Sequence, residues 1–247
     1  MENLAVIPFA ILIGIVLGAL GSGGSILALP ILVYVAALPV RQAIGVSQFV
    51  VGSAALVGTL LQSRQGNICW RNAITLCLAG LPATVLGTWV ARQVQSSHLM
   101  LGFAMILTLT GLRILTNPTA KPSGYFSLPV SLWIGALVGF LTGILGVGGG
   151  FLLVPAMIAF SGLGARQATA TSLPVIAVNS LAGAVQNHAL WGAVLNLALI
   201  FLAGTLVGTF IGLRLGRAAS ELKLKQALGI LLIVVGLVVG VANVRQI

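Results

Sequence analysis

The sequence predicts an all-α polytopic membrane protein made of two inverted repeats, each a Gly-broken helical hairpin plus three transmembrane helices. Of the 247 residues, 59% are hydrophobic and only 6% are charged, whereas roughly 25% of the residues in a soluble domain are charged. Mean hydropathy is +1.16, and several apolar runs match the roughly 20 residues that cross a bilayer. A chain of this composition cannot cover a water-facing surface, so we place it in a membrane.

The repeats are visible as an ungapped internal match at a shift of 125 residues. VRQAIGVSQ (40–48) aligns with ARQATATSL (165–173), and each follows a glycine-rich element that ends in proline. Seven residues of that element are identical in the two copies. They are Gly14, Gly18, Gly21, Gly23, Gly24, Leu27 and Pro30, which align in order with Gly139, Gly143, Gly146, Gly148, Gly149, Leu152 and Pro155. We therefore divide the chain into an N-terminal repeat (1–116), a connector (117–128) and a C-terminal repeat (129–247).

Within each repeat, a Gly-interrupted apolar stretch (4–38 and 129–163) precedes three uninterrupted segments. These are expected at about 43–61, 73–91 and 99–116, and at about 168–187, 192–213 and 226–244. A hairpin in each interrupted stretch leaves nine of the twelve Lys and Arg on one side of the membrane, whereas a single broken crossing leaves seven. The positive-inside rule favours the hairpin. Each half then crosses an odd number of times, so the halves are inverted and both termini lie outside.

The two breaks, GSGGS (21–25) and GVGGG (146–150), are the predicted substrate site. Non-helical backbone is tolerated in a membrane only where protein or a water-filled cavity surrounds it, and a helix that starts there presents unpaired N–H groups and a positive dipole end. Two such starts converging near the midplane would bind a small anion. The candidate residues are Gly21, Ser22, Gly23, Gly24 and Ser25, with Ser25 a possible cap, and Gly146, Gly148, Gly149 and Gly150.

Glycines outside the breaks have a simpler explanation, because small residues let membrane helices pack closely. This explanation fits Gly14 and Gly18, and also two longer series with the same spacing. These are Gly135, Gly139 and Gly143, and Gly204, Gly208, Gly212 and Gly216. It fits the consecutive glycines of the breaks less well.

Polar residues in the next segments supply further candidates. Arg41 and Arg166 open matching segments and are suited to steer an anion at opposite mouths of a pathway, although anchoring to lipid headgroups is the competing explanation. Gln48 and Ser172 lie about two turns further in, where they would line the cavity or bond a neighbouring helix. Asn179 lies deep in its segment, where an unpaired amide is costly, so we expect it to meet substrate or a backbone group.

Several functions are excluded by residues the chain lacks. Glu2 and Glu221 are its only acids, so no carboxylate within a span can bind Na⁺ or carry a proton, which leaves His188 as a candidate for gating or coupling. We find no nucleophile–base arrangement, no metal cluster and no cofactor motif, and expect no enzyme activity. The cations are scattered, which argues against nucleic-acid binding. The expected partners are a small anionic substrate, the lipid bilayer and a further copy in a homo-oligomer.

The doubled G-x-G-G-G/S…P element, the following R-Q-A and the length resemble the TauE/SafE family of sulfite and organosulfonate exporters, also called the toluene sulfonate uptake permease family. The resemblance implies transport of a small sulfur-containing anion, such as sulfite, sulfoacetate or thiosulfate, across a bacterial cytoplasmic membrane. An inside-negative potential favours export of an anion. One departure between the repeats is Gln48, which aligns with Leu173. A transporter or channel for another small solute, and an accessory membrane subunit without transport, remain alternatives.

Overall fold

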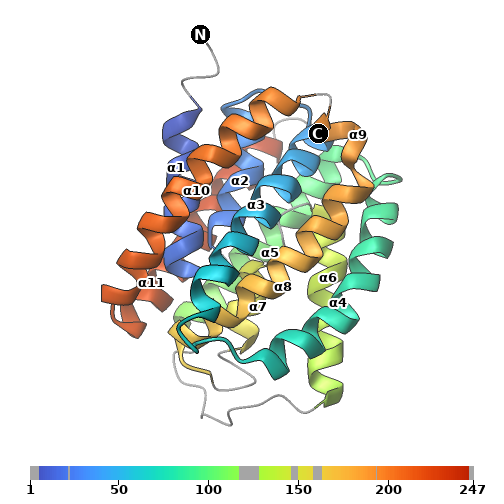
Figure 1. The fold of residues 1–247 in the computed structure, drawn as a ribbon. Helices are drawn as coiled ribbons and strands as arrows, with labels where there is room; N and C mark the ends of the chain where they lie inside the picture. The colour runs from blue at the N-terminus through green and yellow to red at the C-terminus, as the bar shows by residue number, and fades with distance from the viewer. Residues whose placement is uncertain are drawn as a thin grey trace.

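The computed structural model describes residues 6–21, 23–116, 128–145, 150–157, 163–192 and 194–244, and these fold into a bundle of helices (Figure 1). All regular structure in these ranges is helical. The helices are α1 (Ile7–Leu20), α2 (Gly23–Tyr34), α3 (Val40–Ser63), α4 (Trp70–Ala91), α5 (Ser96–Thr116), α6 (Leu128–Leu145), α7 (Gly150–Ala156), α8 (Ala165–Gln186), α9 (His188–Gly192), α10 (Leu195–Ala218) and α11 (Glu221–Val244).

Within the described ranges, seven helices are long and apolar enough to cross a membrane: α3, α4, α5, α6, α8, α10 and α11. Six of them correspond to the uninterrupted segments expected from the sequence, with ends that differ by a few residues. The prediction of an all-helical membrane protein is therefore confirmed. Helices α1 and α2 have 14 and 12 residues and are shorter than the roughly 20 residues of a full span.

The antiparallel pair α3 and α8 forms the centre of the bundle and has the most buried spans. Gly45 on α3 lies beside Asn187, which follows α8, whereas Gly58 lies beside Leu173 near the other end of the pair. The bundle thus has two ends, which we name by their arginines. Helices α3 and α10 begin, and α4 and α8 end, at the Arg41 end; the opposite end is the Arg166 end (Figure 1).

Two further pairs pack through glycine. Where α1 packs against α10, a Cβ on Gly14 would overlap the backbone at Thr205. Where α6 packs against α4, a Cβ on Gly139 would overlap the backbone at Gly80. Both pairs are parallel, because the contacts advance along both helices in the same direction. The explanation of these glycines by close packing is therefore confirmed. Helix α5 pairs with α11, with Gly111 beside Gly229 and Gly236 beside Ala104.

The chain reverses direction at the first break. Gly21 has a φ of +69°, which only glycine adopts without strain, and Gly24 then packs against Leu17, so α2 runs back along α1. Because α2 begins at Gly23, Ser25 lies inside its first turn and does not precede the helix as a cap, contrary to the expectation. Ser22 and residues 146–149, which include Gly146, Gly148 and Gly149, lie outside the described residues. Gly150 is the first residue of α7.

Candidate functional site: an arginine-lined pocket

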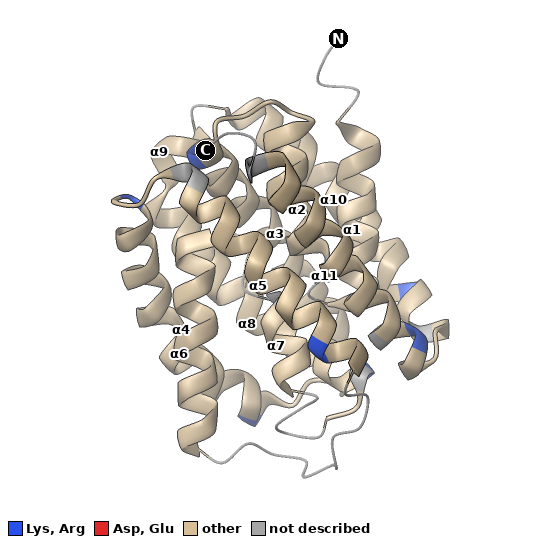
Figure 2. Cartoon of the chain, turned by 180° about the vertical axis from the view of Figure 1, so that it is seen from behind, with Lys and Arg blue, Asp and Glu red and all other residues tan. Residues whose placement is uncertain are grey.

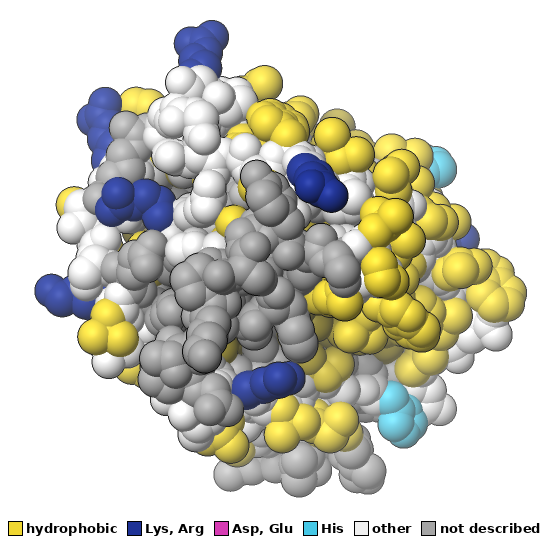
Figure 3. All heavy atoms as spheres, turned by 90° about the horizontal axis from the view of Figure 1, so that it is seen from below, with side chains coloured by type: hydrophobic (Ala, Val, Ile, Leu, Met, Phe, Trp, Pro, Cys, Tyr) yellow, Lys and Arg dark blue, Asp and Glu magenta, His cyan; other side chains and the backbone are white. Residues whose placement is uncertain are grey.

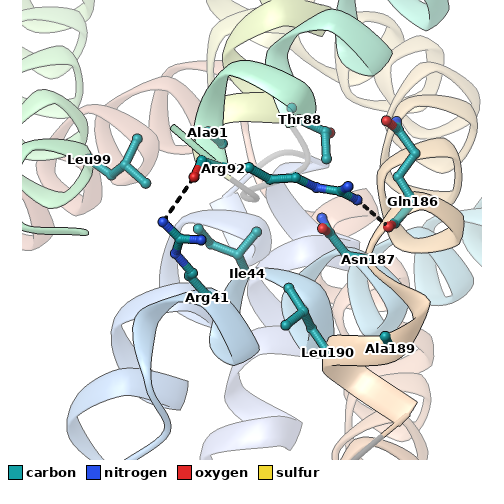
Figure 4. Close-up of a pocket in the computed structure, with 11 residues that line it drawn as sticks. Arg41, Ile44, Thr88, Ala91, Arg92, Leu99, Gln186, Asn187, Ala189 and Leu190 are labelled. Atoms are coloured by element: carbon teal, nitrogen blue, oxygen red, sulfur yellow. Dashed lines mark hydrogen bonds between the residues drawn. The ribbon is translucent and has the colours of Figure 1, made fainter. Parts of the chain in front are cut away.

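A pocket of about 270 Å³ opens at the Arg41 end, where α3 begins and α4 and α8 end (Figure 4). The nonpolar part of its wall consists of Ile44, Ala91, Leu99, Gly143, Ala189 and Leu190. Its polar lining consists of Arg41, Thr88, Arg92, Gln186 and Asn187. We call this cavity the Arg41 pocket.

The two arginines are held by the ends of helices. The Nη2 atom of Arg41 donates a hydrogen bond to the carbonyl oxygen of Arg92 at 3.0 Å, and Nη2 of Arg92 donates to the carbonyl oxygen of Gln186 at 2.6 Å. These carbonyls lie at the negative dipole ends of α4 and α8, which favours a cation there. Each guanidinium has five N–H donors, so both keep donors for a ligand. No acidic side chain is among the described residues that line the pocket, so this part of the lining is net positive.

Gln48 on α3 is hydrogen-bonded to Asn187, a residue of the pocket lining. Its Nε2 donates a hydrogen bond to the carbonyl oxygen of Thr142 on α6 at 3.3 Å, and its Oε1 accepts one from Nδ2 of Asn187 at 2.9 Å. Gln48 is fully buried. Gly183 on α8 makes the space for this amide, because a Cβ at that position would overlap it. The side chain therefore ties α3, α6 and the end of α8 together.

Two buried polar side chains near this network have no hydrogen-bond partner within the described residues. The first is Thr88, which lines the pocket, is 1% exposed and has no partner for its hydroxyl. The second is Asn179, which is 0% exposed and has no partner for its Nδ2 or its Oδ1. Asn179 lies on α8 against Gly80 of α4. Leaving a buried polar group unpaired costs about 1–3 kcal/mol. Such groups therefore need an explanation, and a ligand is one.

The structure separates the residues that the sequence analysis grouped. Among the candidates that the structure describes, Arg41 lines the pocket, Gln48 is hydrogen-bonded to the lining residue Asn187, and Asn179 lies deeper on α8. At the Arg166 end, Arg166 is exposed in the first turn of α8, and the Ser172 hydroxyl donates to the carbonyl oxygen of Thr169 at 2.8 Å.

The expected midplane pocket shared by both breaks stays a prediction, because residues 146–149 of the second break lie outside the described residues. Gly21 packs against Thr169 in the second turn of α8, and the Thr169 hydroxyl donates to the carbonyl oxygen of Leu20 at 3.4 Å. Gly143, shortly before the second break, instead lines the Arg41 pocket. Between Thr169 and Gln186, α8 rises about 25 Å at 1.5 Å per residue. Gly21 and Gly143 therefore lie toward opposite ends of the bundle.

Sequence reasoning did not select Arg92, Thr88 or Asn187 as site residues. A signal for Arg92 was available, because it falls on Arg217 at the repeat shift just as Arg41 falls on Arg166. Thr88 and Asn187 carry no such signal, since they align with Leu213 and Gln62. In the described part of the chain, no three His, Cys, Asp or Glu residues come together as a possible metal site.

Comparison with known proteins identifies the family. The chain matches the family model described as "Sulfite exporter TauE/SafE" over residues 6–239. It belongs to the TauE/SafE family. A probable membrane transporter protein of Xylella fastidiosa (strain 9a5c) is 30% identical over 238 residues, covering 92% of this chain and 91% of the relative.

More distant relatives are similar along most of their length. Probable membrane transporter protein YunE of Bacillus subtilis (strain 168) is 25% identical over 258 residues, covering 92% of this chain and 94% of YunE. Probable membrane transporter protein MJ0441 of Methanocaldococcus jannaschii is 26% identical over 202 residues, covering 74% of this chain and 73% of MJ0441. No solved structure matches the chain significantly. This TauE/SafE protein is thus a membrane transporter, and the resemblance noted in its sequence is confirmed.

Proposed function

We propose that this TauE/SafE protein exports a small sulfur-containing anion, such as sulfite or sulfoacetate, across the cytoplasmic membrane of a bacterium. The observation that carries the proposal is the Arg41 pocket, in which Arg41 and Arg92 are the charged residues of the described lining. Guanidinium groups bind oxyanions by paired N–H···O bonds. The transporter uses no cofactor in this proposal and performs no covalent chemistry.

Size and polarity of the pocket support an anion of this class. A volume of about 270 Å³ suits a solute of a few heavy atoms, and the unpaired Thr88 hydroxyl supplies a further donor. The name of the matched family, sulfite exporter, supports sulfur as the central atom. A sulfonate or sulfite group presents its oxygens on one side, where two guanidinium groups and a hydroxyl can reach them together.

Charge distribution supports the direction of insertion. Arg41 and Arg92 lie at the Arg41 end, whereas most other described cations lie at the Arg166 end (Figures 2 and 3). This second group comprises Arg64, Arg71, Arg113, Arg166, Arg214 and Lys223. By the positive-inside rule the Arg166 end faces the cytoplasm, so the Arg41 pocket faces outward. The membrane potential then contributes about 2.3 kcal/mol per exported negative charge per 100 mV.

Contacts between equivalent residues support inverted repeats and alternating access. Leu173 lies beside Gly58, and Gln48, its repeat equivalent, lies beside Gly183, the equivalent of Gly58. Such exchanged contacts across an antiparallel pair are expected of two repeats related by an axis in the membrane plane. We propose that rocking of one repeat against the other opens the Arg41 end and the Arg166 end in turn.

Proteoliposomes made with the purified protein test the proposed function. Release of trapped sulfite, sulfoacetate, chloride and uncharged acetamide is measured after an inside-negative potential is imposed. We expect sulfite or sulfoacetate to leave faster than chloride, and acetamide to leave no faster than from protein-free vesicles. Equal rates with and without protein for every sulfur anion would refute the proposal, and fast release of acetamide alone would indicate a neutral solute.

A further inference from the structure

Helices α4 and α8 run parallel and place two rows of residues face to face. Asn179 lies against Gly80, and eight residues further on Asn187 and Thr88 both line the Arg41 pocket. Halfway along these rows are Thr84 on α4 and Gly183 on α8, each four residues from its neighbours in the row. Residues four apart lie on the same face of a helix. The rows therefore lead from the pocket about 12 Å into the bundle, at 1.5 Å per residue.

We call the line between the two rows the route. The Gln48 amide lies at the middle of this route. It occupies the space beside Gly183, where a Cβ would overlap it, and both of its polar groups are engaged, with Asn187 and with the Thr142 carbonyl. Thr84 is engaged too, because its hydroxyl lies 2.8 Å from the carbonyl oxygen of Gly80 and 3.0 Å from that of Gly139. The groups at the two ends of the route differ, since the Thr88 hydroxyl and the Asn179 amide have no partner within the described residues.

We propose that Gln48 is a gate between the Arg41 pocket and a second anion subsite at Asn179. This inference rests on the proposed function and deepens it. The ligand is the transported oxyanion, which needs N–H and O–H donors. Such donors are present at both ends of the route, from Arg41, Arg92 and Thr88 in the pocket and from Nδ2 of Asn179 inside.

Opening the gate exchanges hydrogen bonds and needs no covalent step. Asn187 lines the pocket and donates to Gln48, so an oxyanion in the pocket competes with Gln48 Oε1 for the Asn187 amide. Once that bond moves to the anion, Gln48 keeps one hydrogen bond, to the Thr142 carbonyl, and is free to turn away from Gly183. The anion then replaces the Gln48 amide beside α8 and reaches Asn179, whose unpaired amide becomes satisfied.

The repeat makes this gate one-sided. The equivalent of Gln48 is Leu173, which packs against Gly58 near the Arg166 end. A leucine offers no polar group for an anion to displace. The anion-sensitive contact therefore lies only on the side of the Arg41 pocket, and closure at the Arg166 end depends on apolar packing.

Cysteine accessibility tests the gate without relying on transport. In a chain with Cys69→Ala and Cys77→Ala, Asn179→Cys is treated with the impermeant reagent 2-sulfonatoethyl methanethiosulfonate from the Arg41 side. We expect slow modification with Gln48 present and at least about tenfold faster modification with Gln48→Ala, since two hydrogen bonds no longer hold the barrier. Sulfoacetate should slow the faster reaction. The matched control is Ala177→Cys, equally buried on another face of α8, whose modification should not respond to Gln48→Ala.

Equal modification rates of Asn179→Cys with Gln48 and with Gln48→Ala overturn the gate. If Asn179→Cys does not fold, Thr84→Cys, which is nearly the same size as the native side chain, reports the same row from α4 and is judged in the same way. Failure of the gate is distinguishable from failure of the proposed function. Wild-type proteoliposomes that release sulfoacetate while the thiol rates are equal refute only the gate, whereas wild-type proteoliposomes that release no sulfur anion refute the proposed function whatever the thiol rates are.

Discussion

The guanidinium of Arg92 donates a 2.6 Å hydrogen bond to the carbonyl oxygen of Gln186 and so joins the C-terminal ends of α4 and α8 above the pocket. The same residue accepts a hydrogen bond from Arg41 through its own carbonyl, so the two arginines form a chain over three helices (Figure 4). One guanidinium therefore has two roles, since it fixes the mouth of the pocket and also supplies positive charge to it.

Substitutions at Arg92 should separate these two roles. Arg92→Gln removes the charge and should lower the apparent affinity for sulfoacetate by about tenfold or more, since a hydrogen bond to a charged group contributes about 1.5–3 kcal/mol. Arg92→Lys keeps the charge but loses the planar fork, so we expect an intermediate loss. Concentration dependence of sulfoacetate release from proteoliposomes measures both effects. Arg64→Gln, at the opposite end, is the control and should leave affinity unchanged; equal affinities of all variants would contradict the role of Arg92.

The helices were predictable because hydropathy is a local property of the sequence, and the repeat at a shift of 125 residues sets matching bounds in the two halves. Segments 43–61 and 168–187 correspond to α3 and α8 within a few residues at each end. Most of the pocket was not predictable, because Arg41 and Arg92 are 51 residues apart and come together only when α3 and α4 both pack against α8. The depth of the first hairpin was not predictable either, since the sequence marks where a helix breaks but not how far the break reaches into the bundle.

Close packing at Gly139 should make it intolerant of the smallest side chain. Gly139→Ala places a methyl group against the backbone of Gly80, and overpacking of this kind costs about 1–3 kcal/mol. Gly14→Ala, the repeat equivalent, meets the backbone of α10 and should be destabilised to a similar degree. Thermal unfolding in detergent measures both. Gly102→Ala is the control, because nothing lies within 4 Å of a Cβ there, and it should be neutral or slightly stabilising.

The first hairpin should depend on Gly21 for two separable reasons. Gly21 and Gly66 share a φ of +69°, but a Cβ on Gly21 would contact Thr169 whereas a Cβ on Gly66 meets nothing within 4 Å. Gly66→Ala therefore reports the strain of a positive φ without a side-chain contact, about 1–3 kcal/mol, and Gly21→Ala should destabilise the protein by more. Unfolding temperatures in detergent compare the two variants. Equal shifts would show that the contact with Thr169 has no energetic role.

Trp191 should report anion binding through its fluorescence. Its ring stacks on Phe49 with centroids 4.3 Å apart, and its Nε1 donates to the carbonyl oxygen of Ala184 at 2.9 Å. Phe49 follows Gln48 in the sequence, and the backbone N–H of Trp191 donates to the carbonyl oxygen of Asn187 at 3.3 Å. An anion that draws the Asn187 amide away from Gln48 should therefore change the surroundings of the indole.

A chain in which the other three tryptophans are replaced by Phe isolates this signal. Those residues, Trp70, Trp89 and Trp133, are exposed on the outside of the bundle, so their replacement should leave the pocket intact. Titration with sulfoacetate should then shift Trp191 emission with a saturable dependence, and chloride at the same ionic strength should shift it less. Arg41→Gln should weaken the response because it removes one of the two pocket cations. A response that survives unchanged in a variant with both Arg41→Gln and Arg92→Gln would place the anion elsewhere than in the Arg41 pocket.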